Sequence, residues 1–245
     1  MSATFVVTLD ALELPPTMEV AKALAKAHKT PVLDQTAFAK RAWGILAEHL
    51  AENEARALQQ ELKIAGLSCR LIKEDEFIAI PPATAMVRRE AFDPGHLVVI
   101  GAAAIPFTTT TTTHVKEGPT AGQQVVNAAV LMSTGLPLHL GGKKRVIEKT
   151  TTHSDRLFYM DLILRDPWER YRIDAAQFDY ACLNERKGMQ SFANFRLLVD
   201  DFTREAPAAR RNHGVQVLQN KRPILEMDYA ALADYERELR WRLSL

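Results

Sequence analysis

The segment between residues 155 and 183 constrains the fold of this chain most strongly, because its residues specify a pair of strands. Arg156–Arg165 is a mostly apolar run with Asp161 in its middle, and Glu169–Asp174 places Tyr171 and Ile173 two residues apart, as in a β-strand. Asp166-Pro167-Trp168 separates them, and this is turn chemistry because proline presets a backbone angle and aspartate can bond the turn backbone. We therefore predict a two-stranded hairpin.

The apolar residues predict the register of this hairpin. We expect Leu164 to lie opposite Tyr171 and Leu162 opposite Ile173. One face then carries an apolar set: Phe158, Met160, Leu162, Leu164, Tyr171 and Ile173. The other face is mostly polar, and opposite charges can pair across the strands on it: Tyr159, Asp161, Ile163, Arg165, Arg170 and Arg172. A shift of one residue would mix the two sets, so burial of the apolar face should fix the register.

Asp161 lies among three arginines on the polar face, Arg165, Arg170 and Arg172. We interpret this group as a structural ion pair across the two strands. The alternative is a functional group, either an active-site acid or a cradle for an anion.

Composition indicates an ordinary globular protein. The 245 residues are 47% hydrophobic and 25% charged, enough for one large domain or two smaller ones. Lys and Arg number 31 against 30 Asp and Glu, so no net charge attracts nucleic acid or an anionic membrane. The first ten residues lack a signal-peptide pattern, and the longest near-apolar run, Leu97–Phe107, is too short for a membrane span. Cys69 and Cys182 indicate unpaired, buried thiols, so we predict a cytoplasmic protein.

Residues 1–73 predict a small domain with the order strand, helix, helix, strand, helix, strand. Thr17 and Asp34 are the expected N-caps of the first two helices, and Gly66 is the expected left-handed stop of the third. The predicted elements are Thr4–Leu9, a helix from Thr17, a helix from Asp34 to Trp43, Ile45–Leu50, Glu52–Ala65 and Leu67–Ile72.

This order of elements resembles the C-terminal domain of the bacterial ribosomal stalk protein and the related Clp-protease adaptor fold. The local sequence at Glu54–Ile72, EARALQQELKIAGLSCRLI, also resembles that family's last helix, glycine stop and final strand. The resemblance covers residues 1–72 and implies that fold. The family's factor-binding surface needs a turn containing Gly-Leu between its first two helices. This chain has His28–Leu33 there, so the resemblance does not imply the ribosomal function.

Residues 74–85 are predicted to be a linker, because they contain two glutamates, an aspartate and two prolines. Residues 86–205 then form a β-rich domain. Its predicted elements are a hairpin of Met86–Phe92 with His96–Ile100, a helix at Gln123–Met132, a hairpin of Leu136–Leu140 with Arg145–Thr152, the hairpin described above, and a helix at Ser191–Glu205. Strands closed by one helix resemble the pleckstrin-homology-like barrel over residues 85–205. The whole chain is therefore predicted to be α+β.

Residues 206–245 are predicted to hold a basic loop, Arg210–Arg222, followed by an amphipathic helix, Asp228–Leu243. Its apolar stripe must be covered, because a lone helix of this length is marginal in water. We expect Leu232, Tyr235, Leu239 and Trp241 to bind a protein partner or a second copy of the chain, because Trp is common at interfaces. Packing on the chain's own domain is the alternative.

Four sequence patterns typical of large enzyme classes do not occur in the chain. The sequence has no phosphate-binding loop, no G-x-S-x-G elbow, and no C-x-x-C or H-E-x-x-H pattern. We therefore predict no catalytic residue and no cofactor.

Two basic or imidazole clusters are candidate sites. His114, His139 and His153 could hold a divalent metal or supply a general base, although the preferred interpretation is that they end ordinary strands. Lys143, Lys144 and Arg145 follow a glycine pair and could bind a phosphorylated group, with a solvated turn as the preferred interpretation.

The sequence thus favours a non-catalytic binding or scaffold protein that acts through macromolecular interaction. The alternatives are a hydrolase or phosphoryl-handling enzyme that uses dispersed His and Asp residues, and a structural subunit of a larger assembly.

Overall fold

The computed structural model describes residues 3–116 and 146–245, and the chain is of the α+β class, as predicted. It divides into two compact units. The first comprises Met1–Pro106 with Arg156–Leu245, and the second is Phe107–Asp155. In the second unit the described backbone belongs to two strands, and the side chains of Phe107 and Thr108 are exposed.

Residues 3–77, which we call the N-terminal lobe, follow the predicted order of strands and helices. The elements are β1 (Thr4–Leu9), α1 (Thr17–His28), α2 (Val32–Ala42), β2 (Ile45–Ala51), α3 (Glu52–Ile64) and β3 (Cys69–Lys73). The sheet has the order β2-β1-β3, with β1 antiparallel to both neighbours. Thr17 and Asp34 are not the N-caps of the first two helices, as was expected. Pro16 and Pro31 occupy the N-cap positions instead, and neither helix start has a side-chain cap hydrogen bond. Gly66 has a φ of 91°, as predicted for the stop after α3.

The second sheet is mixed and has the order β4-β7-β6-β5-β8. Its strands are β4 (Ala83–Ala85), β5 (Leu97–Lys116), β6 (Val146–Leu164), β7 (Glu169–Asp174) and β8 (Arg210–Arg211). β4 pairs with β7 in parallel, and so does β8 with β5. β4 falls within the predicted linker, and the division of the chain into domains at residues 74–85 stays a prediction.

The predicted hairpin of Met86–Phe92 with His96–Ile100 is wrong. Pro94–His96 forms a 3-10 turn that leads into β5, and residues 86–92 form no strand. Their backbone bonds lead elsewhere: the Met86 amide donates to the Arg172 carbonyl at 2.8 Å, and the Val87 carbonyl accepts from Asp179 at 2.7 Å.

The hairpin of β6 and β7 forms, but its register differs from the prediction by two residues. Leu162 lies opposite Tyr171, and Leu164 opposite Glu169. Because side chains alternate with a period of two, this shift leaves each side chain on its predicted face. Met160, Leu162 and Ile173 are accordingly fully buried on the apolar face.

Helices cover the apolar face of the second sheet. α5 (Ser191–Glu205) has the predicted bounds, and Phe195, Leu198 and Phe202 pack into the same core as Leu162. α6 (His213–Gln219) lies within the segment predicted as a basic loop. It is too short for a periodic pattern, but Val215 and Val217 are fully buried in this core.

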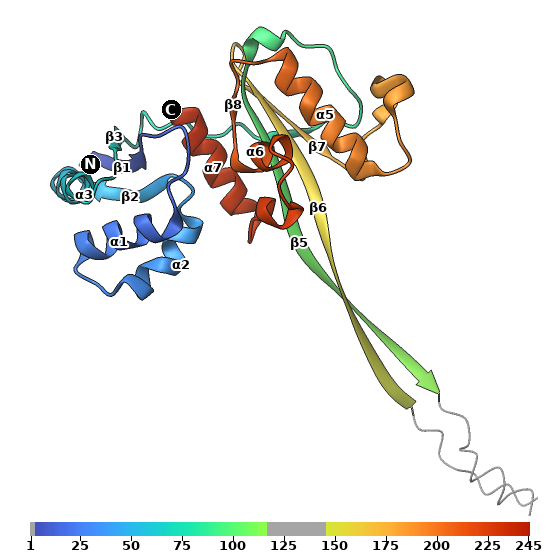
Figure 1. The fold of residues 1–245 in the computed structure, drawn as a ribbon, viewed down its shortest axis with the longest axis horizontal. Coiled ribbons are helices and arrows are strands. Elements are labelled where there is room, and N and C mark those ends of the chain that lie inside the picture. Colours follow the sequence, from blue (N-terminus) through green and yellow to red (C-terminus); the bar gives the residue numbers. More distant parts are fainter. Residues whose placement is uncertain (1–2, 117–145) are drawn as a thin grey trace, which may run out of the picture. The chain divides into compact units, whose positions relative to one another are not determined.

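α7 (Leu232–Ser244) lies between the two sheets, as Figure 1 shows. Tyr235, Leu239 and Leu243 pack with Ile163 on the second face of the hairpin. Trp241 packs into the core of the N-terminal lobe, and its indole N–H donates to the Leu9 carbonyl at 2.9 Å. The apolar side chains of α7 are therefore covered on both sides by the chain itself.

Candidate functional site

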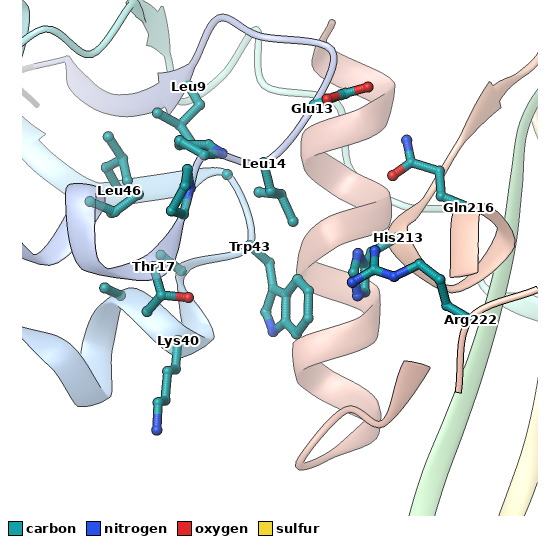
Figure 2. Close-up of a pocket in the computed structure, with 16 residues that line it drawn as sticks. Leu9, Glu13, Leu14, Thr17, Lys40, Trp43, Leu46, His213, Gln216 and Arg222 are labelled. Atoms are coloured by element: carbon teal, nitrogen blue, oxygen red, sulfur yellow. The ribbon is translucent and has the colours of Figure 1, made fainter. Parts of the chain in front are cut away.

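A pocket of about 460 Å³ opens beside α2 and α6 (Figure 2). One side is formed by the loop after β1, the start of α1 and the end of α2, and contributes Glu13, Lys40 and Trp43. The other side is formed by α6 and the loop after it, and contributes His213 and Arg222. Its volume lies in the range of ligand pockets, roughly 300–1,000 Å³.

Trp43 reaches the pocket because of an unusual backbone turn at the end of α2. Its φ is 44° and that of Gly44 is 84°, and a bulky residue rarely adopts such angles without support. The support is Trp241 of α7, which packs so closely that a Cβ on Gly44 would lie 2.0 Å from its ring. Glycine at position 44 thus allows α7 to approach the lobe, while the half-buried Trp43 packs on Tyr229, with ring centroids 4.5 Å apart, and lines the pocket.

A buried polar network fixes the opposite wall. Asn212 caps α6 by accepting from the Val215 amide at 3.0 Å, and its amide donates to the Tyr229 hydroxyl at 2.8 Å. The Tyr229 hydroxyl donates to Glu238 of α7 at 2.5 Å, and the backbone amide of His213 donates to the same carboxylate at 2.9 Å. Hydrogen bonds of these buried side chains therefore hold α6 against α7.

Arg242 extends this network to the loop that carries Glu13. Its guanidinium donates to Glu238 at 3.0 Å and to the Leu12 carbonyl at 2.5 Å, and its side chain is only 3% exposed. Both walls are thus bonded to one rigid helix, which favours a pocket that is formed before a ligand arrives.

The polar side chains of the pocket differ in whether they already form hydrogen bonds or ion pairs within the chain. The His213 ring bonds to the Glu226 carbonyl through Nε2 at 2.8 Å, and its centroid lies 6.0 Å from that of Trp43. Arg222 forms an ion pair with Glu226. Within the described part of the chain, the side chains of Glu13 and Lys40 form no hydrogen bond or ion pair, and both are exposed. These two charges are therefore free to meet a ligand.

The Asp161 cluster is the second group of functional residue types. Asp161 accepts from Arg170 at 2.7 Å and from Arg172 at 2.9 Å, as expected for a cross-strand ion pair. This face is not open to water: Asp161 is fully buried because α7 covers it, and Glu236 of that helix accepts from both arginines. Arg165 does not join the cluster, since its exposed guanidinium lies over the Trp168 ring.

Burial sets the protonation of the Asp161 carboxyl. It raises the pKa of Asp161 from its ordinary 3.8 to about 7, although the Arg172 guanidinium acts to lower it. Because both arginines are already shared with Glu236, the cluster offers no uncommitted cation to an anionic ligand. The ion pairs of the cluster therefore link α7 to the second sheet.

The histidine and basic-turn predictions concern residues that the structure describes little or not at all. His114 and His153 lie in β5 and β6, but their side chains are outside the described part, as are His139, Lys143, Lys144 and Arg145. The predicted helix Gln123–Met132 and strand Leu136–Leu140 lie outside the described residues as well. Elsewhere, in residues 3–116 and 146–245, no three His, Cys, Asp or Glu side chains gather as a possible metal site.

The predicted partner-binding stripe is placed inside the chain. Tyr235, Leu239 and Trp241 are fully buried and Leu232 is half-buried, so the chain itself covers the stripe in this structure, and its binding of a partner stays a prediction. Trp241 packs in the core of the N-terminal lobe, and Tyr235 and Leu239 pack on the second sheet. These side chains are therefore not accessible to another molecule in this conformation.

The two cysteines are free, as predicted. Cys69 is buried, and this burial raises the pKa of its thiol to about 11, so it is a packed apolar residue and not a reactive thiolate. Cys182 is half-buried, and burial raises the pKa of its thiol too.

Comparison of the chain with known protein families, curated proteins and solved structures finds no match. The resemblances to the ribosomal stalk domain and to the pleckstrin-homology-like barrel therefore stay predictions. Among the described helices, none combines the length and apolar character needed to cross a membrane.

Sequence reasoning missed the pocket. Trp43 and His213 lie 170 positions apart, and nothing in either local sequence indicates that they meet. The available signal was the Trp43-Gly44 pair at a helix end, which indicates a left-handed turn but not what lies across from it.

Proposed function

We propose that this chain is a non-catalytic binding protein that recognises a segment of another protein in the pocket beside Trp43. The observation that carries the proposal is the pocket itself, with a half-buried tryptophan between walls fixed by the Gly44–Trp241 contact and the Glu238 network. Aromatic side chains with few rotatable bonds lose little entropy on binding, and they are common anchors at interfaces.

Two exposed apolar residues that are next in sequence to lining residues favour a protein ligand over a small polar one. Leu12 is 78% exposed and precedes Glu13, and Met18 is 51% exposed and follows Thr17 of the pocket. Exposed apolar side chains so near in the chain to the lining can enlarge a contact surface for a protein ligand.

The engagement of His213 supports binding over catalysis. Its ring is the pocket group best suited to proton transfer. However, the ring bonds to a backbone carbonyl and packs near Trp43, as expected for a residue with a structural role in the pocket lining. The hydrolytic alternative rests on His114, His139 and His153, and together with the structural-subunit alternative it stays a prediction.

Selection of peptides from a random display library on the immobilised protein tests the proposal. We expect enriched peptides to lose most of their affinity for a Trp43→Ala variant and to keep it for Trp168→Ala, which removes an exposed tryptophan outside the pocket. Circular dichroism should show that both variants are folded. The proposal fails if no peptide is enriched over the bare matrix, or if enriched peptides bind Trp43→Ala as well as they bind the unaltered chain.

A further inference from the structure

The charges of the pocket are arranged in a way that selects among ligands. Arg222 is neutralised by Glu226, so the uncommitted charges are the Glu13 carboxylate and the Lys40 ammonium. Figure 2 shows Glu13 and Lys40 at opposite ends of the lining, with Leu14 and Trp43 between them. The lining thus runs from a negative end through an apolar middle to a positive end.

The two ends belong to different elements that are held separately. Glu13 lies on the loop after β1, whose neighbouring Leu12 carbonyl is bonded to Arg242 of α7. Lys40 lies in the last turn of α2, on the helix that ends at the Trp43 turn. Because each charge is anchored through its own backbone, the two cannot collapse onto one another without moving a helix or a bonded loop.

From this arrangement we infer that the pocket recognises a dipolar peptide segment, with a basic residue at the Glu13 end, an apolar residue against Leu14 and Trp43, and an acidic residue at the Lys40 end. The inference rests on the proposed function and adds the charge pattern of the ligand: which charge lies at each end of the pocket. A ligand with one sign of charge would satisfy one end and leave the other with only water.

The size of the expected effect follows from the exposure of both charges. Exposed ion pairs contribute little, so each correct charge should tighten binding by about two- to five-fold at low salt. The gain should shrink as ionic strength rises, because salt screens exposed charges. The selectivity therefore has a diagnostic salt dependence, which apolar contact with Trp43 does not share.

The experiment measures binding of blocked synthetic tetrapeptides by tryptophan fluorescence in a Trp168→Phe background, in which Trp43 is the reporter at the pocket. The probes are lysine-leucine-leucine-glutamate, the reversed glutamate-leucine-leucine-lysine, and a neutral form with glutamine at both ends. We expect the affinity order to place one of the two dipolar peptides first and the neutral one below it, with the other dipolar peptide weakest.

Charge variants of the protein then assign each end. Glu13→Gln should remove the advantage of the peptide lysine only, and Lys40→Gln that of the peptide glutamate only. The double variant Glu13→Lys/Lys40→Glu should prefer whichever dipolar peptide the unaltered chain binds more weakly. Glu19→Gln and Lys22→Gln are matched controls, since these exposed residues of α1 do not line the pocket, and they should change nothing.

Three outcomes overturn the inference. Equal binding of all three probes with a Trp43-dependent signal would exclude dipolar recognition while leaving the proposed function intact. Charge preferences that persist in Glu13→Gln and Lys40→Gln would place the recognition elsewhere. A lack of binding by every probe would also exclude it, and the peptide selection described above judges the proposed function separately.

Discussion

The two faces of the β6–β7 hairpin are both buried, but they are stabilised by different chemistry. On one face Met160, Leu162 and Ile173 pack against helices through apolar contacts alone. On the other, Asp161, Arg170 and Arg172 are covered by α7, which adds the carboxylate of Glu236. The first face gains from area removed from water, whereas the second depends on every charge having a partner.

This difference shows that polar residues along one face of a strand do not prove that the face is exposed to water. The alternation of Arg and Asp along the hairpin looks the same whether water or a helix lies above it. What distinguishes the cases is a complementary charge on a distant segment, here Glu236, about 64 residues further along the chain than Arg172. Three predictions sharpen the comparison, taken from the largest expected effect to the smallest.

Arg170→Ala should lower the free energy of unfolding by about 3–5 kcal/mol, the usual cost of removing one partner from a buried ion pair. The Arg170 side chain is 3% exposed, and its loss leaves Asp161 and Glu236 sharing the single guanidinium of Arg172. Urea unfolding measures the change. Arg165→Ala, an exposed arginine of the same hairpin, is the control and should cost about 1 kcal/mol or less. Equal costs for the two variants would show that the second face is not held by its charges.

Leu162→Ala should cost about 2–5 kcal/mol, because the side chain is fully buried and its removal leaves a cavity. Ile163→Ala should cost a similar amount, since α7 buries this neighbour on the opposite face. Thermal unfolding of both variants, with the exposed Leu12→Ala as control, provides the measurement. If Ile163→Ala behaved like the control, α7 would not cover the second face in solution.

Asp161→Asn should change the dependence of stability on pH. Because burial raises the pKa of Asp161 to about 7, the folded state binds more protons than the unfolded state between about pH 4 and pH 7. The stability of the unaltered protein should therefore fall as pH rises through this window, and the asparagine variant should lack that fall. Urea midpoints at several pH values test this, with Asp75→Asn on the surface as control. Parallel curves for Asp161→Asn and the unaltered chain would contradict the assignment.

Local signals in the sequence were enough for much of the fold. β1 and α5 have their predicted bounds, because β1 is a short run rich in strand-forming residues and α5 repeats its apolar residues at helical spacing. Gly66 ends α3 through its positive φ, a property of one residue type at one position. α6 escaped prediction because seven residues flanked by basic ones carry too short a pattern, although Val215 and Val217 were its apolar signal.

Features that depend on distant segments could not be predicted. The hairpin register was displaced by two residues because alternation fixes the face of a strand but not its alignment along the partner. The stripe of α7 was recognised as needing cover, yet the sequence could not show that Trp241 faces one core and Tyr235 another. The pocket depends on the same arrangement, since its walls meet only after α7 has docked.

The packing of Trp241 against Gly44 bears on how the chain folds. The bond from the Trp241 indole to the Leu9 carbonyl joins residues 232 positions apart, so part of the core of the N-terminal lobe is supplied from the far side of the sequence. Contacts of such high separation slow folding, because the loop between them must close first. During synthesis the lobe emerges long before this indole, and until then the apolar surface around Gly44 stays open to other chains and to chaperones.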